Sequence, residues 1–231
     1  MAIKPVYIEI TPQMGELHWE QSPSDELLAQ QLGIIQWLEQ HEKEHIETIR
    51  QGFTSIAILW KEDRFQTRFK NQYMTTKFSR VHLSDRIWQI PVCYDPEYGK
   101  DLGSLAVAKR LSLNSLIKLH AENTYRIHFF GFLPGFMYLN GLPEVLHTPR
   151  KPFPDRTVDP GSVAIGGAQT GIYPRESPGG WHTIGRSPVI FFDIEKDPPV
   201  WAQAGESLEF VPIDGDEMSK LLKNPPSPYL K

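Results

Sequence analysis

The sequence predicts two domains of different class: a small α+β domain over residues 1–88 and a mainly β domain over residues 89–231. The first prediction rests on strand-like and helical patterns that alternate in the order ββαββα. The second rests on glycine and proline, which recur every few residues from Ile127 to Pro188 and exclude helices of ordinary length. The short strands that remain have the spacing of a barrel or sandwich.

The first domain begins with two strand-like segments and a helix. Val6 to Thr11 and Glu16 to Trp19 flank a turn and form a candidate hairpin. Ser22 to Glu26 supplies a cap and first-turn acidic residues, and apolar residues follow at helical spacing, so we predict a helix over about 24–41. The remaining predicted elements are a second hairpin at 46–49 and 54–60, a helix with long loops within 61–79, and a strand at the end of segment 86–93.

The second domain begins with two short amphipathic helices near 102–120, the second with Ser112 as its N-cap. Strands and loops are expected after them. The predicted strands are Tyr125–Phe129, Ser162–Gly166, Gly171–Tyr173, Val189–Phe192 and Ser207–Pro212. The proline-rich tail from Lys223 is expected to fray.

Composition narrows the class of protein. The 231 residues are 40% hydrophobic and 23% charged, which suits a folded core. A net charge of −4 without a Lys/Arg cluster argues against nucleic-acid binding. The single cysteine, Cys93, excludes an intrachain disulfide and a zinc site built from cysteines. The first seven residues lack a signal segment, and no apolar run is long enough to span a membrane, so we expect a soluble cytoplasmic protein without membrane contact.

The pentapeptide His41-Glu42-Lys43-Glu44-His45 fits the patterns of two zinc-protease motifs. Such motifs need both histidines on one exposed face of a continuing helix. Here the apolar periodicity stops at Leu38 and a strand-like run begins at Ile46, which places these residues at a helix end, exposed to solvent. We therefore favour a charged helix terminus over a metal site and predict that this chain binds no metal.

The chain offers neither a strong nucleophile signal nor a phosphate-binding loop. Gly-x-Ser-x-Gly is absent, and the segment Gly166 to Gly171 lacks the lysine of a P-loop. From Phe130 to Arg186, aromatic and polar side chains crowd among glycines, which is the composition of small-molecule pockets. A structural loop that satisfies its own backbone would have the same composition, so both interpretations stay open at this point.

Several short motifs of the second domain match one known family in order and spacing. They are Pro91–Tyr94, His120, Gly131–Phe136 with Tyr138 and Leu139, Thr148–Arg150, Gly161–Ile165, Gln169–Pro174, Glu176–Trp181 and Ile184–Arg186. Together they resemble the allophanate hydrolase subunit 1 family, densely over residues 91–213 and in layout only over residues 1–90.

One segment departs from the family pattern. The family tends to have Pro-Arg shortly before Val-Pro-x-Gly-Ser, whereas this chain has Pro154-Asp155-Arg156-Thr157-Val158-Asp159-Pro160-Gly161. The arginine is displaced by one residue and an aspartate is added, so a role for an arginine at that position does not carry over. Arg150 and Arg186 keep their contexts.

The resemblance implies a cyclophilin-like β-barrel behind the α+β domain. It also implies that the chain works as the B component of a 5-oxoprolinase complex, with an A component and a KipA-like C component as partners. Such a complex opens the lactam of 5-oxo-L-proline with ATP hydrolysis and gives L-glutamate, and the resemblance does not indicate which component binds ATP. Because this chain lacks a P-loop and a metal cluster, we expect it to be inactive alone.

Within this frame, the glycine-rich segments are expected to form a groove for a small cyclic amide or its phosphorylated intermediate. Phe132, Phe136 and Trp181 would wall the groove. An anion or carbonyl would be bound by Gln169, Thr170 and Arg186 and by backbone N–H groups around Gly166–Gly171. No catalytic residue is indicated. The candidate substrate-binding residues are Phe132, Pro134, Phe136, Arg150, Gly166, Gln169, Thr170, Tyr173, Ser177, Trp181 and Arg186.

Two other functions stay open. A relative of the inhibitor KipI would use the aromatic groove to grip a sensor histidine kinase, because aromatic and arginine side chains are common interface anchors. A carboxyltransferase component of the urea carboxylase type would act on urea-like amides and would need a biotinylated partner.

Overall fold

The computed structural model describes residues 4–231, and the first three residues of the N-terminal segment considered above lie outside this range. The chain divides into two compact units, and the boundary in the sequence falls between Leu83 and Ser84. Each unit has a hydrophobic core of its own. No helix of the described part has the length and the apolar run that crossing a membrane requires.

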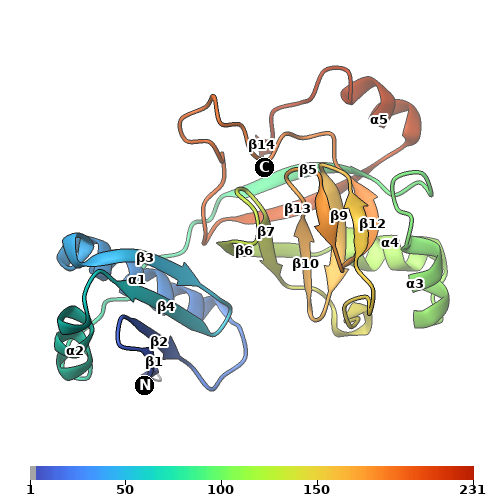
Figure 1. The fold of residues 1–231 in the computed structure, drawn as a ribbon. Helices are drawn as coiled ribbons and strands as arrows, with labels where there is room; N and C mark the ends of the chain where they lie inside the picture. The colour runs from blue at the N-terminus through green and yellow to red at the C-terminus, as the bar shows by residue number, and fades with distance from the viewer. Residues whose placement is uncertain (1–3) are drawn as a thin grey trace. The chain divides into compact units, whose positions relative to one another are not determined.

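The first unit is a four-stranded antiparallel sheet in the order β1-β2-β4-β3, with two helices (Figure 1). Both helices pack on the sheet face that carries Leu17, Ile56 and Ile58, which confirms the predicted ββαββα order with one covered face. Ser24 caps the first helix, and its hydroxyl accepts a hydrogen bond from the Leu27 N–H at 3.2 Å. The elements are β1 (Val6–Thr11), β2 (Met14–His18), α1 (Asp25–His41), β3 (Ile46–Gln51), β4 (Ser55–Trp60) and α2 (Asp63–Gln72).

The His41–His45 segment lies where α1 ends and a short 3-10 turn, η1 (Lys43–His45), begins. The prediction that all its residues are exposed to solvent is wrong for Glu42, which is buried. The Glu42 carboxylate pairs with Arg68 and accepts a hydrogen bond from the His45 ring at 2.9 Å. These partners compensate for the burial of Glu42, because a carboxylate is stable away from water only when it is paired.

The second unit is a closed barrel (Figure 1). Seven strands follow one another in the order β12-β9-β10-β7-β6-β13-β5, and pairing between β12 and β5 closes the ring. Only the β5–β13 pair is parallel among the described barrel strands. The barrel strands are β5 (Ile87–Cys93), β6 (Thr124–Phe130), β7 (Met137–Asn140), β9 (Ser162–Gly166), β10 (Gln169–Ile172), β12 (His182–Arg186) and β13 (Ser207–Ile213).

The other elements of this unit lie around the barrel. The two predicted short helices are present, and the Ser112 hydroxyl caps the second by accepting the Ser115 N–H at 3.1 Å. A separate two-stranded ribbon pairs β8 with β11. The bounds are α3 (Leu102–Lys109), α4 (Leu113–Ala121), a 3-10 turn η2 (Glu144–Leu146), β8 (Asp155–Val158), β11 (Ser177–Gly179), α5 (Gly215–Leu221) and β14 (Tyr229–Leu230).

Strand alternation decides which side chains fill the barrel. Met137, Leu139 and Ile172 are fully buried and belong to the main core of the unit. Tyr138 lies between Met137 and Leu139 on β7, and Gly171 precedes Ile172 on β10. Both face the opposite side, because successive side chains of a strand point to opposite faces. This outer face of β7 and β10 carries the site described below.

Two predictions about this unit are wrong. Val189–Phe192 is not a strand: Val189 and Phe191 are buried and Ile190 is exposed, but the segment joins no ladder. Its apolar alternation comes from coil that packs onto the core. The tail does not simply fray, because β14 pairs with β5 at Trp88 and Gln89.

Candidate functional site

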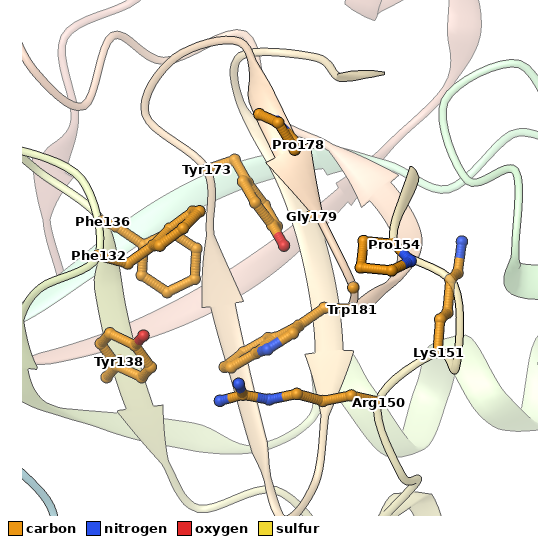
Figure 2. Close-up of a pocket in the computed structure, with 11 residues that line it drawn as sticks. Phe132, Phe136, Tyr138, Arg150, Lys151, Pro154, Tyr173, Pro178, Gly179 and Trp181 are labelled. Carbon is orange, nitrogen blue, oxygen red and sulfur yellow. The ribbon is translucent and has the colours of Figure 1, made fainter. Parts of the chain in front are cut away.

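A pocket of about 310 Å³ lies on the outer face of the barrel (Figure 2). Its walls come from the β6–β7 loop, from β7, from the segment before β8 and from the residues around β11. The lining residues are Phe132, Phe136, Tyr138, Arg150, Lys151, Pro154, Tyr173, Pro178, Gly179, Gly180 and Trp181.

Glycines make room for the aromatic rings of this pocket. A Cβ atom on Gly166 would lie 2.5 Å from the Trp181 ring, and one on Gly171 would lie 2.8 Å from the Met137 carbonyl oxygen. On β11, a Cβ atom on Gly179 would lie 2.4 Å from the Tyr173 hydroxyl. The glycine-rich sequence therefore provides a flat face on which bulky rings lie directly against the strands.

The rings hold one another edge to face. The ring centroid of Phe136 lies 5.0 Å from that of Tyr173 and 5.6 Å from that of Trp181, with interplanar angles of 89° and 88°. Tyr138 meets Trp181 at 5.8 Å and 77°. Such pairs are favourable beyond the area they bury, so the wall of the pocket is preformed and rigid.

Phe132 differs from these packed rings because it is 61% exposed and has a φ angle of +64°. The Leu133 N–H bonds to the Gly131 carbonyl at 2.7 Å, which makes Phe132 the centre of a γ-turn. A bulky residue at positive φ is strained, and such strain is concentrated at functional sites. The turn places the Phe132 ring at the mouth, 5.6 Å from the ring centroid of Phe136.

Arg150 supplies a positive charge to the pocket. Its guanidinium lies 5.6 Å from the centre of the Trp181 ring, within range of a cation–π contact (Figure 2). Among residues 4–231, no carboxylate lies within ion-pair distance of Arg150. This side chain is therefore available to an anionic ligand.

The positive charge of the neighbouring Lys151 is balanced by two carboxylates. Its ammonium nitrogen lies 2.6 Å from carboxylate oxygens of both Asp101 and Asp155. Burial acts to lower the pKa of Lys151, but these hydrogen bonds outweigh it and raise the pKa above its usual value. Lys151 is thus a charged, paired ammonium and not a nucleophile.

The two tyrosines of the pocket remain protonated. Burial raises the pKa of Tyr173 to about 12, and it raises the pKa of Tyr138 against the opposing charge of Arg150. Both phenols can donate a hydrogen bond to a carbonyl or carboxylate oxygen at neutral pH.

The model of the family described as carboxyltransferase domain, subdomain C and D, matches residues 11–202 of this sequence. The chain belongs to this family. The resemblance to the allophanate hydrolase subunit 1 family that the motifs indicated is confirmed.

Curated members of the carboxyltransferase-domain family are similar to this chain over part of its length. The 5-oxoprolinase B component of Haemophilus influenzae is 45% identical over 150 residues, which are 64% of this chain and 70% of that protein. The 5-oxoprolinase B component of Bacillus subtilis is 41% identical over 131 residues, which are 57% of this chain and 55% of that protein.

Two solved structures share the fold. The crystal structure of TTHA0988 has a TM-score of 0.76 and 29% identity, and the match covers 88% of this chain but 40% of that one. Urea carboxylase of Kluyveromyces lactis has a TM-score of 0.78 at 14% identity, and the match covers 97% of this chain and 23% of that one. In both, the fold of this chain is one part of a longer polypeptide.

The structure brings together five of the predicted site residues of this family member. They are Phe132, Phe136, Arg150, Tyr173 and Trp181, which all line the pocket. Gly166 lies beneath the Trp181 ring, where its missing side chain matters more than its N–H group.

The other predicted site residues lie outside the pocket lining. Thr170 is buried, and its hydroxyl accepts a hydrogen bond from the His120 ring at 3.0 Å and donates one to the Ala164 carbonyl at 3.1 Å. The Arg186 Nε donates to the Pro160 carbonyl at 2.8 Å. Pro134 is exposed in the β6–β7 loop, Gln169 begins β10, and Ser177 is buried at the start of β11. Their direct roles stay predictions.

The list of candidate substrate-binding residues left out Tyr138, Lys151, Pro154, Pro178, Gly179 and Gly180, although the sequence groups Tyr138 with Phe132 and Phe136 as aromatic residues that are hard to bury together. A signal for Tyr138 was present, because it alternates with the core residues Met137 and Leu139. Lys151 and Pro154 gave none, since their place depends on the way segment 148–155 folds back beside β11.

Proposed function

We propose that this chain is the B component of an ATP-dependent 5-oxoprolinase, which hydrolyses 5-oxo-L-proline to L-glutamate together with its A and C components. The observation that carries the proposal is the similarity of this chain, at 41–46% identity, to three proteins that bear the name of the 5-oxoprolinase B component. The incomplete coverage of longer chains such as TTHA0988 supports a need for further polypeptides. In this proposal the assembled complex uses the ATP. The barrel of this chain is proposed to be cyclophilin-like.

The pocket suits the proposed substrate. 5-Oxoproline is a small, flat lactam ring that carries one carboxylate. The ring would pack against Phe136 and Trp181, and the carboxylate would pair with Arg150, whose planar fork can bind both oxygens. A hydroxyl of Tyr138 or Tyr173 would donate to the lactam carbonyl and polarise it, which is the activation that amide opening needs.

Reconstitution with the A and C components tests the function. We expect ATP-dependent release of glutamate from 5-oxoproline by the complex and none by this chain alone. A complex that hydrolyses ATP but never releases glutamate from the lactam would contradict the proposal.

Arg150→Met in the same complex tests the site. The KM for 5-oxoproline should rise about 10- to 100-fold, because a hydrogen bond to a charged group contributes ~1.5–3 kcal/mol. Arg64→Met serves as the matched control, since Arg64 is an exposed arginine on α2 of the first unit. Equal KM values for the two variants would remove Arg150 from substrate binding while leaving the proposed activity intact.

A further inference from the structure

Arg150 and Lys151 are adjacent cations that turn to opposite sides. The guanidinium of Arg150 lies beside the Trp181 ring, whereas the ammonium of Lys151 points away from the aromatic rings (Figure 2). Thr148 and Lys151 each precede a proline, which favours extended backbone at both positions. Neighbouring side chains in extended backbone point to opposite faces, so a fixed direction of Lys151 favours the opposite direction for Arg150.

Lys151 ends in a neutral network of two cations and two carboxylates. Asp101 and Asp155 each lie 2.6 Å from the Lys151 ammonium, and Lys100 lies 3.2 Å from Asp155. The Lys151 side chain is 15% exposed, so its ion pairs are shielded from solvent more than most surface pairs. Asp155 is the acidic residue at which the sequence departs from the family pattern, and in this chain it supplies half of the negative charge around Lys151.

The network is anchored to rigid elements. Asp101 immediately precedes α3, and its carboxylate accepts the Thr183 N–H of β12 at 2.7 Å. Asp155 begins β8. The backbone N–H of Lys151 donates to the Gly180 carbonyl at 2.7 Å, beside the pocket.

We infer that Lys151 is a positioning residue, whose ion pairs with Asp101 and Asp155 keep Arg150 turned into the pocket and unpaired. Without the Lys151 ammonium, segment 148–155 would lose the ion pairs that fix its direction. Lys100 pairs with Asp155 alone, so the unpaired charge of Asp101 would draw Arg150 towards it. Arg150 would then leave the Trp181 ring. The nature of the ligand that Arg150 binds rests on the proposed function, but the position of Arg150 does not.

The first test measures the position of Arg150 in the full chain alone. The NMR signal of its Nε–H group, assigned by its loss in Arg150→Met, should be shifted by the ring current of Trp181. We expect Lys151→Met to move this signal toward those of exposed arginines and Lys151→Arg to retain it. An unchanged Arg150 signal in a folded Lys151→Met protein would overturn the inference.

Two variants guard this test against a general loss of structure. Asp155→Asn removes one carboxylate but keeps the Lys151–Asp101 pair, so it should shift the Arg150 signal in the same direction by a smaller amount. Asp193→Asn removes the same charge from an exposed loop, where Asp193 pairs with Lys196 at 3.8 Å, and should leave the signal in place. Equal shifts in both asparagine variants would contradict a specific role for the network.

The second test uses the reconstituted complex and a double-mutant cycle. Lys151→Met should raise the KM for 5-oxoproline roughly three- to tenfold with little change in kcat, as expected for coupled neighbours. In the Arg150→Met background it should have no further effect. A purely structural role would give equal effects in both backgrounds and would refute the inference. If the wild-type complex released no glutamate, the proposed function would fail, and the NMR test would still decide the role of Lys151.

Discussion

Single glycines decide whether the aromatic wall of the pocket can form. The Trp181 ring occupies the space that a side chain would fill at Gly166, and the edges of Trp181 and Phe136 approach the position of a Cβ atom on Gly171 at 3.0 and 3.1 Å. A side chain at either glycine would have to displace the rings, because the hydrogen bonds between the barrel strands fix the backbone below them.

Gly166→Ala should therefore lower the free energy of unfolding by about 1–3 kcal/mol, the cost of overpacking a well-filled site. Urea denaturation with tryptophan fluorescence would measure the loss. Gly103→Ala is the matched control, because among residues 4–231 its added Cβ atom would meet nothing within 4 Å apart from its chain neighbours and the backbone of its own helix. As Gly103 lies in helix α3, alanine should stabilise the chain there by up to about 1 kcal/mol. Two variants of equal stability would contradict the packing described for Trp181.

The aromatic and arginine residues of the pocket could be predicted from their setting among glycines, whereas the roles of Thr170 and Gly171 could not. These neighbours on β10 face opposite sides of the sheet, so a shift of one residue exchanges the barrel interior for the pocket. The sequence around Thr170 contains too few large apolar residues to fix that phase.

At the scale of elements, the β6–β7 loop holds an exposed ring at the cost of backbone strain. Phe132→Gly should relieve the positive φ angle, which costs of order 1–3 kcal/mol for a side-chain-bearing residue, and stability should stay level or rise. The KM of the reconstituted complex for 5-oxoproline should increase, because the mouth of the pocket loses its ring.

Thermal unfolding and steady-state kinetics on the same preparation would measure both effects. Phe153→Gly removes another exposed ring, which is 84% exposed and outside the pocket lining, and should not change the KM. A Phe132→Gly protein that is less stable than wild type and has an unchanged KM would show that the loop serves the fold alone.

Strands with clear alternation or hairpin turns were predictable, and strand β12 was not. His182–Arg186 contains one large apolar residue, Ile184, and a glycine that suggests a break. Gly185 is needed inside the strand, because a Cβ atom there would lie 2.8 Å from Val92 on the neighbouring β5. Close approach of two strands in a closed barrel is a tertiary demand, so no local pattern reveals it.

For the whole molecule, a buried histidine links barrel stability to pH. His120 is fully buried and contacts the Tyr94 hydroxyl at 2.9 Å and the Thr170 hydroxyl at 3.0 Å. Since Thr170 donates its own proton to Ala164, His120 donates from Nε2 and accepts from Tyr94 at Nδ1. Burial lowers the pKa of His120 to about 3, so the folded barrel holds it neutral.

The unfolded chain binds a proton at His120 below a pKa of about 6.5, whereas the folded chain does not until about pH 3. This contribution to stability is complete above pH 6.5 and is lost as the pH falls, by about 2 kcal/mol between pH 7.5 and pH 5. His120→Gln should lower stability at pH 7.5 but flatten this pH dependence. Urea denaturation at both pH values would measure it, with exposed His82→Gln as control. A slope equal to that of wild type would rule out His120 as the source.

The ring of strands closes through one registered pair, Arg186 opposite Cys93. Cys93 is fully buried, burial raises the pKa of its thiol, and the sequence contains no other cysteine. Cys93 is therefore a single thiol at the point where the barrel closes. The rate at which a thiol reagent labels the native protein would therefore measure how often β12 separates from β5. A ligand bound on the outer face of the barrel should slow this labelling.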